Sequence, residues 1–156
     1  RDKISAVREA MPSAFIGVDL IVGFPGEDEE KFNHTLRFLK DLDVSYYHAF
    51  SFSARPKTPA YSMNNQIPGE VVKDRSQRVQ ELAEEKKKAF YDRHTGQTRN
   101  VLLEGSQKNG KAFGFTDNFI RVEVPQVPPD LQGTIRKVEL LQVSEQGNMT
   151  GRITEA

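Results

Sequence analysis

The chain has 156 residues, enough for one domain with a full core or for two small domains. Its 22 lysine and arginine residues balance 22 aspartate and glutamate residues, which excludes long-range attraction to nucleic acid or to an anionic membrane. Any site for a polyanion must therefore be a local patch. No cysteine is present, which excludes disulfides, thiolate metal sites and a cysteine nucleophile, and the three scattered histidines do not predict a metal site. Since neither a long apolar run nor a secretory leader occurs, we expect a soluble, cytoplasmic protein without a membrane span.

The chain begins with patterns for a helix, a strand and a second helix. Apolar residues at helical spacing predict a helix over residues 2–11 that ends at Pro12. A nearly all-apolar run over residues 15–22 is typical of a parallel strand buried on both faces. Acidic residues 28–30 suit the first turn of the next helix. Its buried side is predicted to be Phe32, Leu36, Leu39 and Leu42.

A Gly-Phe-Pro-Gly turn over residues 23–26 separates that strand from the second helix. Gly23 and Gly26 allow backbone N–H groups to approach a ligand, and Pro25 stiffens the loop. Glu27 adds a carboxylate at the carboxyl end of the strand, where ligands bind in α/β sheets. A tight strand-to-helix turn without a ligand is the alternative, because short glycine motifs are weak signals.

A second strand over residues 44–52 completes a strand–helix–strand unit. The proline-containing segment 53–69 follows as a loop at the same edge, and residues 70–93 predict a charged helix. The Glu-Glu-Lys-Lys-Lys run at 84–88 is interpreted as its solvated face. Arg55 in the loop suits a phosphate or a carboxylate.

Two polar residues lie inside the predicted strands. A buried carboxylate needs a partner, so Asp19 is either a site residue or the partner of a helix terminus or a basic group. His48 either faces the same cleft or is a hydrogen-bonded core histidine. Both alternatives stay open for each residue.

After Gly96 the pattern changes to short runs of strand-forming residues separated by turns. Five such runs predict a small antiparallel barrel, a fold that often binds oligonucleotides on one face. They are residues 99–103, 112–115, 119–124, 135–143 and 151–154. We therefore expect two domains, an α/β domain over residues 1–93 and an all-β domain over residues 94–156.

Three aromatic residues in the predicted barrel lie near two cations. Phe113, Phe115 and Phe119 could stack unpaired bases while Lys111 and Arg121 contact phosphates. The alternative is that the aromatic rings fill the core of the barrel, because small barrels need such residues inside.

Segments 19–27, 48–60 and 114–122 together resemble the radical-SAM methylthiotransferases. The resemblance covers nearly the whole chain and implies the fold class α/β plus all-β. The first part would be a partial parallel (β/α) barrel with a linking helix. The second would be the small antiparallel five-stranded RNA-binding barrel called a TRAM domain. Because the chain starts in mid-helix at Arg1, we expect it to be a C-terminal fragment of a longer protein.

The resemblance also implies an enzyme that modifies tRNA. The segment 47–53 looks most like the bacterial enzymes that methylthiolate N6-threonylcarbamoyladenosine beside the anticodon, so the implied partner is a tRNA anticodon stem-loop. The alternatives are a methylthiotransferase acting on isopentenyladenosine in tRNA or on a ribosomal-protein aspartate. A non-catalytic RNA-binding module is a further alternative.

The implied cofactors of the full-length enzyme are S-adenosylmethionine and two iron–sulfur clusters. The clusters need cysteines, so this chain departs from the family at the chemistry itself, and we expect the fragment alone to hold no cofactor and to be inactive. By position, the residues implied near S-adenosylmethionine are Gly23, Pro25, Gly26, Glu27, Ser51, Ser53 and Arg55. The implied RNA contacts are Lys111, Phe115 and Arg121. Lys57 stands where family members commonly have glycine.

Overall fold

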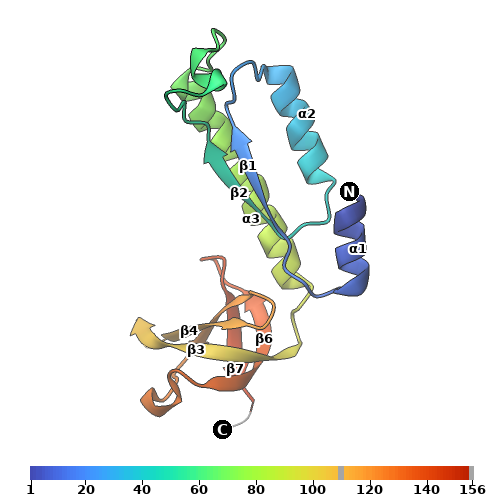
Figure 1. Cartoon of the computed structure of the whole chain (residues 1–156). Helices are drawn as coiled ribbons and strands as arrows, with labels where there is room; N and C mark the ends of the chain where they lie inside the picture. The colour runs from blue at the N-terminus through green and yellow to red at the C-terminus, as the bar shows by residue number, and fades with distance from the viewer. Residues whose placement is uncertain (109–110, 155–156) are drawn as a thin grey trace. The chain divides into compact units, whose positions relative to one another are not determined.

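The protein folds as two compact units, Arg1–Lys86 and Lys87–Ala156, in a computed structural model that describes residues 1–108 and 111–154 (Figure 1). The second unit therefore begins within the long helix predicted over residues 70–93, earlier in the chain than the boundary expected after residue 93. Among the described residues, no helix is both long and apolar enough to cross a membrane.

The first unit is a parallel strand–helix–strand unit with two further helices, as predicted. In chain order its elements are α1 (Asp2–Ala10), β1 (Gly17–Val22), α2 (Glu29–Lys40), β2 (Tyr46–Ser51), the 3-10 turn η1 (Pro59–Ser62) and α3 (Gly69–Asp92). β1 and β2 pair in parallel, with Gly17 opposite Tyr46 and Val22 opposite Ser51. The carboxyl ends of both strands therefore lie at the same edge of the sheet.

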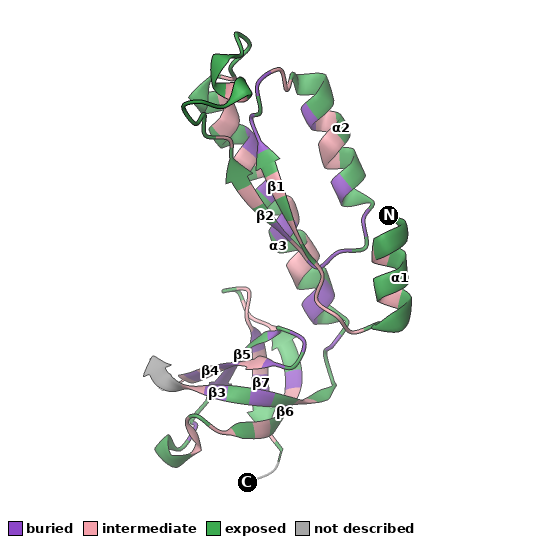
Figure 2. Cartoon of the chain, in the orientation of Figure 1, coloured by how far each residue is buried: buried purple, intermediate pink, exposed green. Residues whose placement is uncertain are grey.

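The core of the first unit lies on one face of this two-stranded sheet. Val22 and Tyr47 pack there against α2 and α3, which contribute Phe32, Leu39, Val79 and Ala83. Figure 2 shows exposed residues alternating with less exposed ones along β1. The expectation that this strand is buried on both faces is wrong: Ile21 is 57% exposed, because both helices cover the same face.

The open face of the sheet also corrects the interpretation of Asp19. Asp19 is exposed and stands opposite His48 in the parallel register, so it is not a buried carboxylate that needs a partner. His48 is exposed as well, with its ring centroid 4.9 Å from that of Tyr46, and is therefore not a core histidine. Strand alternation places both side chains on the face opposite the helices.

The second unit is a closed barrel of five strands in the order β3-β4-β5-β7-β6. The strands are β3 (Thr98–Lys108), β4 (Lys111–Thr116), β5 (Arg121–Pro125), β6 (Ile135–Val143) and β7 (Met149–Ile153), and the turn η2 (Pro129–Leu131) precedes β6. The barrel is mixed rather than antiparallel as expected, because β5 and β7 pair in parallel. A closed ring with an odd number of strands must contain at least one parallel pair.

Aliphatic side chains fill the barrel, and the three phenylalanines of β4 and its hairpin do not. The inward residues of β4 are Ala112, Gly114 and Thr116, all buried. A Cβ atom on Gly114 would contact the backbone oxygen of Leu102 on the neighbouring strand. The core consists of Val101, Leu103, Ala112, Ile120, Val122, Val124, Val127, Val138, Leu140 and Met149. Of the two interpretations of the aromatic residues, core filling is therefore wrong.

We predict that the stability of the first unit falls as the pH rises from about 10 to about 12. The Tyr47 hydroxyl is buried and donates to the carbonyl oxygen of Leu39 at 2.5 Å, and burial raises its pKa to about 12 from the ordinary 10.0. The unfolded chain loses this proton first, so stability present below pH 10 is lost across that window. A pKa difference of two units on one group corresponds to roughly 2–3 kcal/mol in the free energy of unfolding.

Urea unfolding followed by circular dichroism at pH 9, 10 and 11 measures this slope. The stability of Tyr47→Phe should fall much less over this pH range. The stability of Tyr61→Phe should fall as much as that of the wild type, because Tyr61 is 55% exposed. Equal slopes for wild type and Tyr47→Phe would contradict the assignment.

Candidate functional sites

The Gly-Phe-Pro-Gly turn needs both of its glycines for the backbone path. Gly23 has φ +81° and Gly26 has φ +84°, the left-handed region that favours glycine. A Cβ atom on Gly23 would lie 2.5 Å from a methyl carbon of Val72, and one on Gly26 would contact the side-chain amide of Asn65. The turn is therefore packed closely against α3 and the loop that precedes it.

The amide groups of both glycines are used within the chain. Gly23 N donates to Glu27 Oε1 at 3.2 Å, and Gly26 N donates to the carbonyl oxygen of Asn65 at 2.9 Å. The tight-turn interpretation accounts for these two N–H groups. A ligand role for the residues of the turn stays a prediction.

Arg75 on α3 is the central residue of this site, although no motif in the sequence predicted it. Its side chain is 4% exposed, and Nη1 donates to the backbone oxygen of Glu27 at 2.7 Å and to Glu27 Oε1 at 2.8 Å. Its guanidinium carbon lies 5.1 Å from the centroid of the Phe32 ring. The available signal was its position between Val72 and Val79 on the apolar side of a helix, where a cation needs a buried acceptor.

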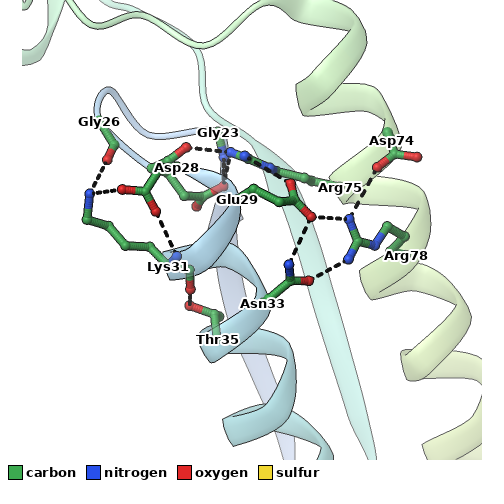
Figure 3. Close-up of polar contacts among 11 residues, drawn as sticks. Gly23, Gly26, Asp28, Glu29, Lys31, Asn33, Thr35, Asp74, Arg75 and Arg78 are labelled. Carbon is green, nitrogen blue, oxygen red and sulfur yellow. Dashed lines mark hydrogen bonds and ion pairs between the residues drawn. The ribbon is translucent and has the colours of Figure 1, made fainter.

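Exposed ion pairs surround this buried contact. Arg78 Nη1 lies 3.0 Å from Glu29 Oε1, and Lys31 Nζ pairs with Asp28 at the start of α2 (Figure 3). The hydrogen bond from Arg78 lowers the pKa of the Glu29 carboxyl, and the hydrogen bond from the Lys31 side chain lowers that of Asp28. Both carboxylates therefore stay ionised at the N-terminus of α2, where negative charge complements the helix dipole.

A pocket of about 390 Å³ lies at the carboxyl ends of β1 and β2. Gly23 and Ser51 line it together with Lys73 and Ser76 from α3, and the hydroxyls of Ser51 and Ser76 are 2.9 Å apart. The structure thus brings together two of the seven predicted cofactor residues. Pro25, Gly26 and Glu27 form the adjoining turn, and Ser53 and Arg55 are exposed in the loop after β2.

Lys57, at the position where the resemblance implies glycine, has a backbone conformation that favours glycine. It has φ +69°, which is uncommon for a residue with a side chain. The loop after β2 therefore follows a glycine-like path at Lys57.

A second candidate site is the outer surface of the barrel. We define the aromatic surface as Leu102, Phe113, Phe115, Phe119, Arg121 and Ile135. The Arg121 guanidinium carbon lies 5.4 Å from the Phe113 ring centroid and 5.5 Å from that of Phe115. The Phe115 and Phe119 centroids are 6.4 Å apart. Aromatic faces beside a cation suit unpaired bases and their phosphates.

Strand pairing extends this surface across four strands. Phe115 stands opposite Arg121 on β5 and opposite Leu102 on β3, and Leu102 stands opposite Ile135 on β6. Leu102 is 51% exposed and Ile135 is 64% exposed. Exposed apolar side chains in a continuous row are typical of an interaction surface.

Two of the three predicted RNA contacts, Phe115 and Arg121, lie together on this surface. The third, Lys111, is used differently: its Nζ lies 3.1 Å from Oε1 of Glu123, whose side chain is only 4% exposed. Lys111 thus compensates a buried carboxylate, since a buried charge needs a partner. Its role in binding RNA stays a prediction.

The chain thus combines two folds and two candidate sites. A parallel strand–helix–strand unit has a pocket at its carboxyl edge, and a closed barrel with an aromatic outer surface follows it. No family model matches the chain. It is 35% identical to tRNA-2-methylthio-N(6)-dimethylallyladenosine synthase of Bacillus pumilus, over 99% of the chain and 31% of that protein. The synthase of the same name from Thermobifida fusca is 46% identical over 64% of the chain and 20% of that protein. Threonylcarbamoyladenosine tRNA methylthiotransferase MtaB of Chlamydia pneumoniae is 35% identical over 94% of the chain and 34% of that protein.

The chain therefore belongs to the tRNA methylthiotransferase family, which confirms the resemblance found in the sequence. The chain spans about a third of the length of the relatives that it matches over nearly all of its residues.

We predict that Arg75→Gln destabilises the first unit by about 2–4 kcal/mol, because it leaves Glu27 and the turn without their buried donor. Arg78→Gln is the matched control and should cost about 0–1 kcal/mol, since Arg78 is 34% exposed and pairs with exposed carboxylates. Urea titrations monitored by circular dichroism measure both values. Similar losses for the two variants would remove Arg75 from its central role.

Proposed function

We propose that this chain is the tRNA-binding part, and one side of the S-adenosylmethionine site, of a radical-SAM enzyme that methylthiolates tRNA. Family membership supports the reaction class, because the relatives compared above are named for tRNA methylthiolation. The observation that supports this chain's own part most directly is the aromatic surface with Arg121 on the barrel. An overall charge of zero is compatible with this role, since the cation and the rings form a local site.

We propose N6-threonylcarbamoyladenosine beside the anticodon as the substrate. The segment 47–53 favours it, and relatives from Chlamydia pneumoniae and Bacillus subtilis carry that nucleoside in their names. The synthases from Bacillus pumilus and Thermobifida fusca are named for the dimethylallyl nucleoside, which is the competing substrate.

S-adenosylmethionine fits the pocket at the carboxyl edge of β1 and β2 by the chemistry of its lining. The hydroxyls of Ser51 and Ser76 suit ribose or carboxylate oxygens, and the Lys73 ammonium suits a carboxylate. Within this proposal Gly23 lines the pocket, and Pro25, Gly26 and Glu27 shape the turn beside it. When bound, S-adenosylmethionine supplies the radical chemistry. Ser53 and Arg55 would approach it from the loop after β2.

The iron–sulfur clusters implied by the family do not fit this chain, because their ligands are cysteine thiolates and the sequence contains none. We assign their ligands to parts of the full-length enzyme outside these residues. The residues described above would then bind S-adenosylmethionine and tRNA and hold the first unit in shape.

We predict that the full-length enzyme restores a 2-methylthio nucleoside in the tRNA of a bacterial strain that lacks its own methylthiotransferases. Mass spectrometry of digested tRNA distinguishes the products. The threonylcarbamoyl product supports the proposed substrate, and the dimethylallyl product would replace it with the competing one. Absence of both products from a strain that expresses the folded enzyme would overturn the proposed function.

We predict that Arg121→Gln weakens binding of an anticodon stem-loop RNA and reduces the magnitude of the salt slope, d log K/d log[salt], by about 0.7–0.9, the change expected for one lost phosphate contact. Arg152→Gln is the control, because Arg152 is exposed on β7 and pairs with Glu139 at 2.6 Å. Fluorescence anisotropy at several salt concentrations measures both. An equal change for the two variants would indicate general electrostatics and not a contact at the aromatic surface.

A further inference from the structure

The hairpin between β4 and β5 contains a bulky residue in a position that favours glycine. Phe119 N donates to the carbonyl oxygen of Thr116 at 3.2 Å, and Thr116 N donates to that of Ile120 at 3.0 Å. Phe119 itself has φ +62°. Short hairpins of this kind place a residue in the left-handed region after the turn, usually a glycine, and an aromatic residue there is strained.

Buried polar side chains hold this turn in shape. We define the hairpin polar cluster as His94, Thr116 and Asn118, which are 4%, 6% and 8% exposed. Thr116 Oγ1 accepts from Ile120 N at 2.9 Å and donates to Asn118 Oδ1 at 2.7 Å. The Asn118 amide lies 3.1 Å from His94 Nε2, and His94 Nδ1 lies 2.8 Å from the carbonyl oxygen of Phe90.

These bonds also assign the protons of the hairpin polar cluster. Nδ1–H of His94 donates to Phe90, which leaves Nε2 to accept from Asn118. Each side chain of the cluster thus has a partner that fixes its orientation. The backbone of Phe119 follows from this arrangement, so its left-handed conformation does not depend on the phenyl ring.

The phenyl ring of Phe119 contributes little to the barrel. Phe119 is 68% exposed, and its ring contacts that of Phe115 on the aromatic surface. Glycine at this position would adopt the same backbone without strain. Strained residues that a fold does not require are concentrated at functional sites.

We infer that Phe119 is a stacking residue for an unpaired nucleobase, presented by the hairpin polar cluster beside Arg121, which takes the adjoining phosphate. The inference rests on the proposed function. It adds that the bound RNA contains a base with a free face, as in a loop, and that a base inside a duplex would not bind there. Charge complementarity favours RNA over a protein partner, because the Arg121 cation lies over the Phe113 and Phe115 rings, and the Phe115 ring contacts the exposed ring of Phe119.

The test compares the affinity for RNA with the stability of the barrel in the whole chain. The probe is a labelled 17-nucleotide anticodon stem-loop, with a blunt duplex of the same stem sequence as the second probe. Phe119→Gly should weaken stem-loop binding about 5- to 150-fold, the range expected for one lost stacked base, and leave the salt slope unchanged. Its melting temperature should stay equal or rise, because strain is removed. Binding of the duplex should not change.

Three variants separate stacking from other effects. Gln126→Gly is the matched control: Gln126 is also exposed in the barrel unit, with φ +56°, so this change should relieve similar strain without altering affinity. Phe119→Tyr should bind as wild type does, because the aromatic face remains. Phe119→Leu should bind as weakly as Phe119→Gly, because it retains a bulky apolar side chain without an aromatic face.

The outcomes distinguish this inference from the proposed function. If the wild-type chain binds the stem-loop and Phe119→Gly binds it equally well, the inference is overturned but the proposed function is not. Loss of activity of the same variant in the full-length enzyme at unchanged RNA affinity would also overturn the inference, because Phe119 would then act in some way other than binding RNA. A wild-type chain that binds neither probe would overturn both the inference and the proposed RNA contact.

Discussion

The buried contact between Arg75 and Glu27 is the interaction on which the first unit depends. A single guanidinium nitrogen bonds both the carboxylate and the backbone oxygen of Glu27, and that carboxylate in turn accepts the Gly23 amide. The contact therefore joins α3 to the turn between β1 and α2, and fixes the edge of the sheet at which the pocket lies. A buried cation is costly without acceptors, so the turn and the helix constrain each other.

The barrel depends on a different constraint, the small space inside five strands. Small residues of β4 point inward, where Gly114 lies too close to Leu102 for any side chain, and aliphatic residues from the other strands complete the core. Alternation along the strand then places Phe113 and Phe115 outside. The aromatic surface is thus a consequence of how the barrel is packed, and Arg121 from the adjacent strand completes it.

The two units offer different kinds of site. The pocket of the first unit has hydroxyl and ammonium groups suited to a small polar molecule, and the surface of the second has rings and a guanidinium suited to a nucleic acid. A tRNA-modifying enzyme needs both a small-molecule site and a contact with the RNA, so the pair of sites agrees with family membership. Lys111 shows that a cation near a site need not act there, since its charge compensates buried Glu123.

The sequence by itself determined the elements and the family. Helical and alternating patterns predicted the strand–helix–strand unit, α3 and the five barrel strands, because these patterns reflect local geometry. Only the tertiary structure decided which faces are covered, since a pattern of apolar residues does not reveal what packs against it. For that reason the sequence left two interpretations open for Asp19 and for the phenylalanines of the barrel. The parallel pair of β5 and β7 arises because the closed barrel has an odd number of strands. The roles of Arg75 and of the hairpin polar cluster depend on contacts between residues far apart in the chain. The conformation of Phe119 depends on a backbone angle that its residue type does not specify.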